Sequence, residues 1–435
     1  MTKISIIGAG SHVFSRRLIA DFLTWPSLQD ATIALMDLNQ DRLDLMAALA
    51  RKMVAQQGVG ARIEATTSLK PALEGADYAI VTIRVGESRN HVEIPARYGV
   101  SQAIGDTAGP GGAFYFLHNA PAMIEIAKTM EQLCPHALML NYTNPMVMLC
   151  WAIKELSDIR CVGLCHSVQG TAMTLAEYIG VPFEQVSYWV AGINHMAWFL
   201  EFRCQGHDAY PLLWEAMKKP EIYEQDIVKW EIMKYFGAFV SESSIHNSEY
   251  MPYFRRTPEL VDRYTSERMW GVGKKSETPE ERRARYAGER RKQDEQNRLW
   301  AYGDAPIPVE RSHEYGSRIL NAIRTHVPYV FNGNVPNTGL ITNLLPNCVV
   351  EVPIMVDGLG LHPCYVGDLP PALAALNRSN LALQELVVKG FVERDRESIY
   401  RAIQLDPLTT AILALPEIRR MVDEMFEADR EYITF

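Results

Sequence analysis

The start of the chain carries the feature that most limits its fold. An apolar run from Ile4 to Ile7 passes directly into the glycine turn Gly8-Ala9-Gly10-Ser11 and then into a stretch of helical character that reaches about Leu23. This order is the phosphate-binding start of a dinucleotide-binding unit, because the glycines let backbone N–H groups approach a pyrophosphate at the positive end of the helix. Val13 stands where the usual pattern has a third glycine, so the turn alone is a weak signal.

An acidic residue follows the second apolar run. Ala31–Met36 reads as a strand and ends in Asp37. A carboxylate at the end of the second strand suits the ribose hydroxyls of NAD and repels the additional phosphate of NADP. An ordinary turn aspartate after a strand would look the same in the sequence.

Polar clusters also follow the later strands. Ala76–Ile83, Leu138–Leu140 and Cys161–Leu164 read as three more strands, separated by helical stretches. The alternation predicts an α/β fold with a parallel, doubly wound, Rossmann-like sheet. Ligands of such sheets bind at the carboxyl ends of the strands. Each of these three strands ends in a glycine-bearing or polar segment, namely Arg84-Val85-Gly86, Asn141-Tyr142-Thr143-Asn144-Pro145 and Cys165-His166.

Length and charge narrow the class of protein. A chain of 435 residues suits two lobes that share a cleft. We expect an NAD-binding domain over residues 1–185 and a C-terminal α+β domain over 186–435 that carries substrate groups and oligomer contacts. The net charge is −9 without a basic tract, which makes nucleic acid and anionic membranes poor partners.

The chain shows no signal for export or membrane insertion. Residues 1–10 have no cationic stretch followed by an apolar core and a cleavage site. The apolar stretch from Ala137 to Ile153 is broken by Asn141, Asn144 and Pro145, so it makes a poor membrane span. Seven cysteines without framework spacing argue against a disulfide scaffold. We therefore expect a cytoplasmic protein with reduced thiols.

Two segments before residue 145 offer polar groups. Asp106 opens a loop rich in glycine and proline, Gly105 to Gly112, which either exposes backbone N–H groups near a cofactor or forms a surface turn. Asn141 and Asn144 carry amides that can bond to sugar hydroxyls, or that can satisfy the backbone of their own turn.

Three later segments could contribute to chemistry. Cys165 and His195 are residue types that bind divalent transition metals, and two protein ligands would leave positions open for substrate. They lie 30 residues apart without a recognised metal spacing, so a buried thiol and a core histidine remain the alternative. The polar segment Ser241–Phe254 could supply a tyrosine base if a nearby cation lowered its pKa, or could form a loop over the cleft. The charged run Glu280–Asp294 is typical of a solvated helix.

The motifs taken together resemble glycoside hydrolase family 4, from Ile4 to about Asp423, with the α-galactosidase (melibiase) branch as the nearest pattern. The Cys-His-Ser-Val tetrad at 165–168 distinguishes that branch, because relatives acting on 6-phosphorylated sugars carry Asn at the position of His166. The matching segments are Gly8–Ser11, Asp106–Gly112, Leu140–Met146, Gly163–Gly170, Ala191–Ala197, Ser241–Phe254, Glu314–Tyr315, Gly333–Val335 and Val350–Val352.

The resemblance implies a role for individual residues. Cys165 and His195 would be the ligands of a divalent metal, usually manganese. Tyr250, in preference to Tyr253, would be the base, and Asp106 would be a candidate proton donor. The substrate contacts implied are Asn144 and His166, and the cofactor contacts are Gly8, Gly10, Ser11, Asp37 and Asn141.

The resemblance also implies an unusual reaction. Family 4 is an exception to the two-carboxylate scheme of glycosidases. NAD oxidises C3 of the sugar, the base removes the C2 proton, and the C1–O bond breaks by elimination before water adds and C3 is reduced again. A homodimer or homotetramer acting on a small α-glycoside is implied as well.

One segment departs from the family pattern. The helix after Gly112 usually carries two arginines one turn apart, and here Tyr115 and His118 occupy those places. The departure leaves an α-glucoside or an α-uronide open as the substrate. Two further alternatives are a simple NAD-dependent dehydrogenase of a sugar or hydroxy acid, which would form net NADH, and a non-catalytic NAD-binding regulator.

Overall fold

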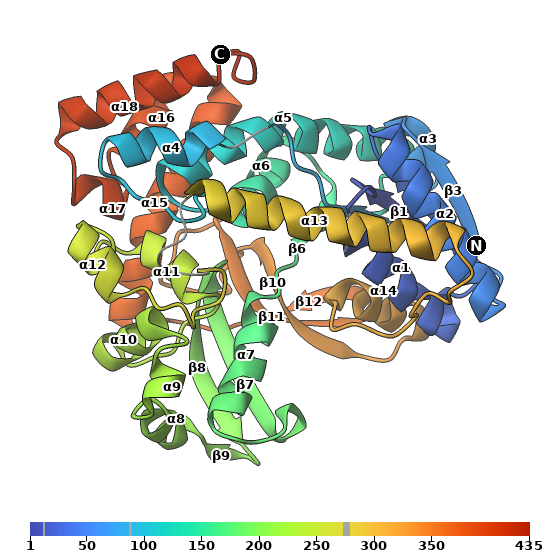
Figure 1. Ribbon diagram of the computed structural model, residues 1–435, viewed down its shortest axis with the longest axis horizontal. Coiled ribbons are helices and arrows are strands. Elements are labelled where there is room, and N and C mark those ends of the chain that lie inside the picture. Colours follow the sequence, from blue (N-terminus) through green and yellow to red (C-terminus); the bar gives the residue numbers. More distant parts are fainter. Residues whose placement is uncertain (12–13, 87–88, 273–278) are drawn as a thin grey trace.

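One large mixed sheet runs through the molecule. The computed structural model describes residues 1–11, 14–86, 89–272 and 279–435, so Val13 lies outside the described residues. Twelve strands form the sheet in the order β3-β2-β1-β4-β5-β6-β10-β11-β7-β8-β9, with β12 paired to β11. Figure 1 shows helices on both sides of it.

The first half of the sheet is parallel, as the sequence predicts. Its strand order, 3-2-1-4-5-6, is that of a doubly wound dinucleotide-binding fold. The five predicted strands are present, and one further strand, β3, lies at the edge. The bounds are β1 Lys3–Ile7, β2 Thr32–Met36, β3 Arg62–Thr66, β4 Tyr78–Val81, β5 Leu138–Asn141 and β6 Arg160–Gly163.

The second half of the sheet is antiparallel and continues from β6 without a break. The predicted domain boundary at 185/186 falls directly before β7. Because the sheet runs through, the division into two domains stays a prediction. The bounds are β7 Val186–Ile193, β8 Met196–Cys204, β9 His207–Asp208, β10 Tyr329–Pro336, β11 Val349–Asp357 and β12 Gly360–Pro363.

Helices pack in groups against the sheet. The contacts join α1 to α2 and α14, and α5 to α3, α6 and α15. The helices are α1 Phe14–Thr24, α2 Gln40–Gln57, α3 Leu69–Leu73, α4 Arg89–Arg97, α5 Gly109–Leu133, α6 Met146–Leu156, α7 Ser167–Tyr178, α8 Tyr210–Ala216, α9 Pro220–Tyr223, α10 Ile227–Phe236, α11 Ser244–Tyr250, α12 Pro258–Arg263, α13 Pro279–Tyr302, α14 Tyr315–Thr325, α15 Pro371–Glu393, α16 Arg396–Ile403, α17 Pro407–Thr410 and α18 Leu415–Ala428, with short 3-10 turns at Pro26–Leu28 and Phe183–Gln185.

The first glycine turn is as tight as its sequence suggests. Gly8 has φ +87°, and a Cβ atom there would lie 2.5 Å from the Thr82 carbonyl oxygen. A Cβ on Gly10 would lie 2.7 Å from a carboxylate oxygen of Asp37. Only glycine fits both places, so the turn after β1 is drawn against the ends of β2 and β4.

The segment after Asp106 differs from the expected loop. Gly109–Gly112 form the buried first turn of α5, which begins after Ala108 with Pro110 in its first turn. Proline suits this position because its missing N–H has no partner within the helix. A Cβ on Gly112 would lie 2.5 Å from the Thr107 carbonyl carbon, so these glycines serve close packing beside Asp106.

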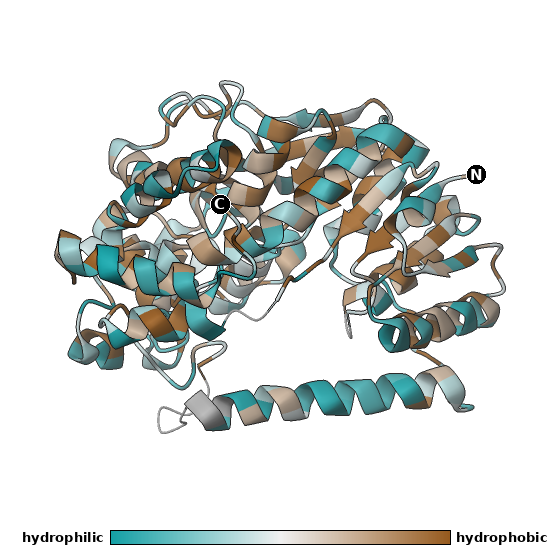
Figure 2. Ribbon diagram, turned by 90° about the horizontal axis from the view of Figure 1, so that it is seen from above, coloured by the Kyte–Doolittle hydropathy of each residue, from teal (hydrophilic) through white to brown (hydrophobic). Residues whose placement is uncertain are grey.

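Two arrangements bear on function. Within the described residues, none of the helices is both long and apolar enough to cross a membrane. The helix α13 runs along one side of the main body, as Figure 2 shows, contacts α2, and is largely hydrophilic.

Candidate active site

The two predicted metal ligands meet at the carboxyl edge of the parallel sheet. Cys165 follows β6, and His195 lies in the tight turn between β7 and β8. The Cys165 Sγ atom lies 3.3 Å from His195 Nε2. Glu242 completes a group of three whose ligand atoms all lie within 4.8 Å of one another. His195 and Glu242 both have positive φ angles, 63° and 76°, which side chains other than glycine adopt rarely.

The donor set fits a divalent transition metal. Burial lowers the pKa of His195, so its imidazole is neutral and offers a lone pair. Burial, and then the charge of Glu242, raises the pKa of Cys165, so the thiol keeps its proton until a cation displaces it. A thiolate, an imidazole and a nearby carboxylate match the ligands that manganese or zinc accepts while leaving positions open for substrate.

A chain of acid–base groups adjoins this site. His246 Nδ1 lies 3.0 Å from a Glu242 carboxylate oxygen, and His246 Nε2 lies 3.5 Å from Asp106. The Asn144 amide donates to the other Asp106 oxygen at 3.3 Å. His246 of α11 therefore links these segments. It lies beside Asp106 and His195, and Asn144 joins the group through Asp106.

The shared hydrogen bonds decide which groups are charged. Burial alone would raise the pKa of Asp106, but the hydrogen bond and charge of His246 outweigh it, so that pKa is lowered. Burial would lower the pKa of His246, but its bonds to Asp106 and Glu242 hold it well above the usual value. The proton of this group therefore resides on His246, between two carboxylates.

The two candidate tyrosines lie in different surroundings. Tyr250 ends α11, is buried, and donates to the Asn194 carbonyl oxygen at 3.4 Å. Burial raises the pKa of Tyr250, so its phenolate needs positive charge nearby to form. Tyr253 is 46% exposed and packs against Phe236 and Phe254.

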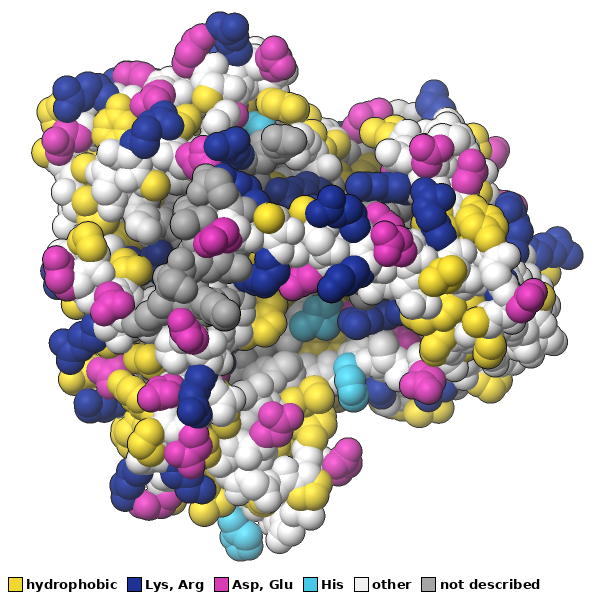
Figure 3. Space-filling view, in the orientation of Figure 1, with side chains coloured by type: hydrophobic (Ala, Val, Ile, Leu, Met, Phe, Trp, Pro, Cys, Tyr) yellow, Lys and Arg dark blue, Asp and Glu magenta, His cyan; other side chains and the backbone are white. Residues whose placement is uncertain are grey.

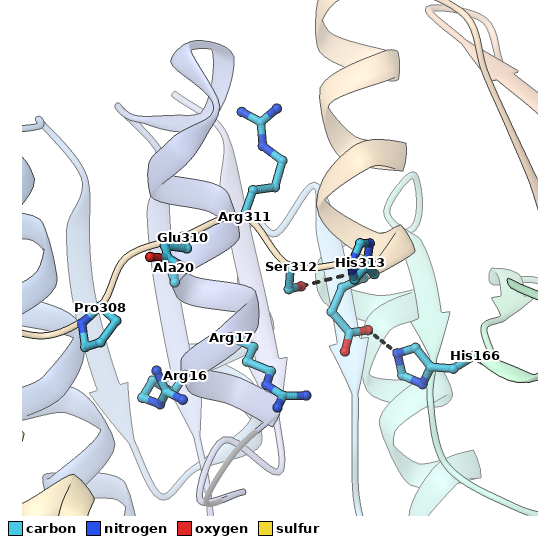
Figure 4. A pocket seen from close by; sticks show the side chains of 10 residues that line it. Arg16, Arg17, Ala20, His166, Pro308, Glu310, Arg311, Ser312 and His313 are labelled. Atoms are coloured by element: carbon cyan, nitrogen blue, oxygen red, sulfur yellow. Dashed lines mark hydrogen bonds and ion pairs between the residues drawn. The ribbon is translucent and has the colours of Figure 1, made fainter. Parts of the chain in front are cut away.

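His166 faces a cavity beside the metal ligands. Its Nε2 atom lies 2.5 Å from a carboxylate oxygen of Glu314, the residue before α14. Burial would lower the pKa of His166, but the bond to Glu314 outweighs it and raises that pKa. Figure 4 shows the His166 ring turned toward this carboxylate. The cavity has a volume of about 500 Å³ and is lined by charged and polar side chains, including Arg16, Arg17, Arg311, Ser312 and His313.

The predicted cofactor contacts lie along the same sheet edge. The Asp37 carboxylate accepts hydrogen bonds from the backbone N–H of Gly10 at 2.8 Å and of Asn39 at 2.9 Å. Ser11 directly follows the glycine turn. Asn141 is fully buried, and its side chain bonds the Thr143 backbone N–H and carbonyl of its own turn. The N–H groups of Gly8 and Ala9 both donate to the Met36 carbonyl oxygen at 2.9 Å, so what the glycines provide here is the close approach of the turn to the ends of β2 and β4.

Comparison with known proteins decides the family. A model described as family 4 glycosyl hydrolase matches residues 3–181, and one described as the C-terminal domain of family 4 glycosyl hydrolases matches residues 190–409. The chain belongs to glycosyl hydrolase family 4. The predicted resemblance is thereby confirmed.

Individual relatives cover the whole length of this family 4 chain. An alpha-galactosidase of Bacillus subtilis is 38% identical over 100% of this chain and 99% of the relative. An alpha-galactosidase of Rhizobium meliloti is 35% identical over 99% of this chain and 89% of the relative. The crystal structure of a putative glucosidase from Bacillus subtilis superposes with a TM-score of 0.86 at 26% identity, over 98% and 99% of the two chains.

The two residues that depart from the family pattern lie on the α5 wall of this family 4 enzyme. Tyr115 is nearly buried, with the Arg84 guanidinium 5.9 Å from its ring centre. His118 points away to a buried group with His91 and Asp429, in which both imidazole Nε2 atoms lie near one Asp429 oxygen, at 2.7 and 3.2 Å. At one of the two arginine positions, His118 thus belongs to a buried polar group that also contains His91 of α4 and Asp429 of the C-terminal tail.

Four buried or half-buried side chains near the metal ligands were not predicted from the sequence: Glu242, His246, Glu314 and Glu351. Glu242 and His246 lie in the segment Ser241–Phe254, but nothing in that run marked them out from the other polar residues. Glu351 is fully buried on β11, and burial raises its pKa well above the usual value. A polar residue in a run of apolar β-branched residues, as in Val349-Val350-Glu351-Val352, was the available signal.

Proposed function

We propose that this family 4 enzyme hydrolyses terminal α-galactosides with the help of NAD and a divalent metal, with manganese as the metal. The observation that carries the proposal is the 3.3 Å approach of Cys165 to His195 beside the Asp106–His246 pair, on the sheet edge that also bears the Gly8–Gly10 turn. A hydrolase with two carboxylates would not need a thiol and imidazole pair at this place. The two alpha-galactosidase relatives support galactose as the sugar.

Two groups of residues would hold the cofactors. Gly8, Gly10, Ser11 and Asp37 would hold NAD, and Asn141 would support the turn on which it rests. Cys165 and His195 would hold the metal, with Glu242 close enough to act as a third ligand or to accept from a bound water. When bound, NAD⁺ would oxidise the sugar at C3 and later restore it, and the metal would draw electrons from that carbon so that the C2 proton becomes acidic.

The side chains of the chain itself would move the protons. Tyr250 would take the C2 proton as a phenolate, since its hydroxyl lies in the buried layer next to the metal ligands. Burial raises its pKa, so it would first have to lose its own proton to solvent under the influence of the bound cation. Asp106 would pass a proton to the departing oxygen of the C1–O bond. Because Asp106 is ionised beside a protonated His246, His246 would supply that proton through the hydrogen-bonded pair.

Two residues would orient the sugar. The Asn144 amide, fixed by Asp106, and the His166 imidazole, fixed by Glu314, lie on opposite sides of Cys165 along the chain and converge on the same edge. Both side chains can donate to sugar hydroxyls. In Figure 3, histidine side chains show in the hollow below α13, with Lys and Arg side chains around it.

The test is release of p-nitrophenol from p-nitrophenyl α-galactoside. The assay contains NAD⁺, Mn²⁺ and dithiothreitol together and then lacks each in turn. With enzyme from which bound NAD has first been removed, we expect cleavage that stops without NAD⁺ or Mn²⁺ and forms no net NADH. Cleavage that persists without both, or the absence of cleavage of any glycoside, would refute the proposal.

Parallel assays separate the remaining alternatives. The α-glucoside and the α-galacturonide test whether Tyr115 and His118 have moved the specificity away from galactose. Steady NADH formation from a free sugar would indicate a simple dehydrogenase. NAD binding without any turnover, unchanged by Cys165→Ser, would indicate a binding protein.

We also propose a cytoplasmic homodimer or homotetramer. Large apolar side chains that are exposed in the single chain, such as Trp270, Tyr235 and Leu359, support a further association. The reduced state required of Cys165 supports the location. Light scattering coupled to size exclusion chromatography measures the mass, and a monomer at micromolar concentration would contradict the assembly.

A further inference from the structure

The helix α13 crosses the cofactor half of the molecule as a separate layer. It runs past α2, which directly follows Asp37, and the two helices are in contact. Its sequence is almost entirely polar, with a charged outer face. Apart from Trp300 and Ala301 in its last turn, which pack against the main core, the helix gains little from burial, so specific polar contacts at a few points must help to fix its position.

One lysine fixes the C-terminal end of α13. The Lys52 ammonium group of α2 donates to three backbone carbonyls, those of Trp300, Gly303 and Ala305, at 2.8, 2.6 and 2.9 Å. The Trp300 carbonyl lies in the last turn of α13, at the negative end of the helix where a cation is favourable, and Gly303 and Ala305 lie just beyond that end. Charge-assisted hydrogen bonds of this kind are stronger than neutral ones.

The other end of α13 lies beside α4. Arg283 pairs with Glu93 of α4 at 3.2 Å, and both side chains are substantially exposed. Exposed pairs of this kind contribute little. The helix is therefore attached to α2 at its C-terminal end and reaches α4 near its N-terminal end.

The inner face of α13 lies over the end of the glycine turn. Asp294, Asn297 and Arg298 line a small gap whose other wall is formed by Gly10, Asp41 and Arg42. Asn297 is fully buried although the helix around it is polar and mostly exposed. The gap has a volume of about 40 Å³. By this measure one water molecule needs roughly 10–15 Å³, so the gap has room for only a few water molecules.

We propose that α13 forms the outer wall of the site for the adenosine half of NAD and must move aside for the cofactor to enter or leave. The proposal rests on the proposed function. Asn297 and Asp294 present amide and carboxylate groups toward the place where the second strand ends in Asp37, which suits ribose hydroxyls and adenine nitrogens. Since the gap is too small for a nucleoside, binding requires α13 to swing about its Lys52 attachment.

A retained cofactor suits the proposed reaction. The sugar is oxidised and reduced within one turnover, so NAD⁺ is regenerated in place and need not exchange. A helix that slows the exchange of bound NAD with solvent would not lower the turnover rate. It would prevent the reduced cofactor from leaving before C3 of the sugar is reduced again. An ordinary dehydrogenase, which must release its cofactor after every reaction, would be slowed by the same device.

The first experiment measures release of bound NADH after mixing with excess NAD⁺, by stopped-flow fluorescence. Lys52→Met removes the attachment without touching the cofactor site, and Asn297→Ala removes the inner contact. Lys70→Met, an exposed lysine of α3, is the matched control. We expect release to be at least tenfold faster in Lys52→Met, several-fold faster in Asn297→Ala and unchanged in Lys70→Met.

The second experiment needs no variant. Hydrogen–deuterium exchange of the wild-type chain should slow over residues 290–302 when NAD⁺ is added. This inference alone would be overturned if both Lys52→Met and Asn297→Ala released NADH at the wild-type rate. It would also be overturned if hydrogen–deuterium exchange over residues 290–302 were the same with and without NAD⁺. A wild-type chain that binds no NADH at all would overturn both this inference and the proposed function.

Discussion

The molecule contains two groups of imidazole and acidic side chains that are alike in size and differ in almost every other respect. The first is Cys165, His195 and Glu242 at the sheet edge, and the second is His91, His118 and Asp429 behind the α5 wall. In each, the candidate ligand atoms lie within 4.8 Å of one another. We call them the edge cluster and the wall cluster.

The wall cluster is closed. Both of its imidazole Nε2 atoms lie near the same Asp429 oxygen, its three residues are buried, and Tyr432 stacks on His118 with ring centres 4.2 Å apart. Burial lowers the pKa of His91, and although burial acts to raise the pKa of Asp429, the bonds from His118 and His91 lower it. Two imidazoles around one buried carboxylate join the C-terminal tail to α4 and α5.

The edge cluster is open by comparison. It has two positive φ angles, a thiol that burial keeps protonated, and a neighbouring imidazole, His246, that carries a proton. Strain and mismatched pKa values are retained where a site must bind and react. Similar residue types therefore stabilise the fold in the wall cluster and are available for chemistry in the edge cluster. The difference lies in the burial of the side chains and in the charge of the groups beside them.

The largest expected effect comes from removing a ligand of the edge cluster. Cys165→Ser and His195→Asn should each reduce the rate of α-galactoside cleavage by roughly 10³-fold or more, since the metal stabilises the charge that develops in the reaction. Measurement of kcat/KM, together with Mn²⁺ binding by calorimetry, checks this. Cys204→Ser, at the end of β8, serves as the control thiol and should retain activity. If Cys165→Ser kept full activity, the edge cluster would not be the site of the chemistry, and its contrast with the wall cluster would fail.

The next effect separates the two tyrosines. Tyr250→Phe should lower kcat by roughly 10²–10⁴-fold, the usual contribution of a general base, while Tyr253→Phe should change it by less than about threefold. A primary isotope effect with substrate deuterated at C2 would show whether proton removal limits the rate. Equal losses in the two variants, or a larger loss in Tyr253→Phe, would place the base outside the buried layer.

Much of this arrangement could be predicted from the sequence because it depends on local pattern. The strand–turn–helix start, the alternation of apolar runs and the polar strand ends predict the parallel half of the sheet and its functional edge. The contact between Cys165 and His195 could not be predicted from their spacing of 30 residues. It depends on β6 and β7 belonging to one sheet with β10 and β11 inserted between them, which is a property of the whole topology.

The parts that sequence reasoning missed depend on long-range packing. His246 looked like any polar residue of its segment until α11 placed it between Asp106 and Glu242. His118 was noted as a departure from the family pattern, yet its partner Asp429 lies more than 300 residues away along the chain. Charge state is equally non-local, since burial and partners decide it.

A substitution in the wall cluster should lower the stability of the protein and leave its catalytic rate unchanged. Asp429→Asn removes the shared carboxylate and should cost about 2–4 kcal/mol of the free energy of unfolding, because both imidazoles lose their common acceptor in a buried place. The activity of the folded variant at 25 °C should stay within about twofold of wild type. Urea unfolding measures the first quantity and steady-state kinetics the second.

A nearby surface pair is the matched control for that change. Glu427→Gln breaks an ion pair with Arg430 in which both side chains are about 70% exposed. Such a pair contributes roughly 0–1 kcal/mol, so the variant should be close to wild type in stability. Loss of activity in Asp429→Asn without loss of stability would mean that the wall cluster takes part in the reaction.

The smallest effect is a pH dependence that the wall cluster should confer. Burial lowers the pKa of His91 in the folded chain below its unfolded value of about 6.5, so the unfolded chain binds the extra proton first. The stability that depends on a neutral His91 is therefore present above pH 6.5 and is lost as the pH falls. Wild-type Tm should drop between pH 7 and pH 5 by more than the Tm of His91→Asn, whose side chain does not titrate. Calorimetric scans of the two chains at both pH values, in the same buffer and salt, give the difference. An equal drop would contradict a lowered pKa of His91. A smaller drop in the wild type than in His91→Asn would show that folding raises this pKa, and the wall cluster would then resemble the protonated His246 of the edge cluster instead of contrasting with it.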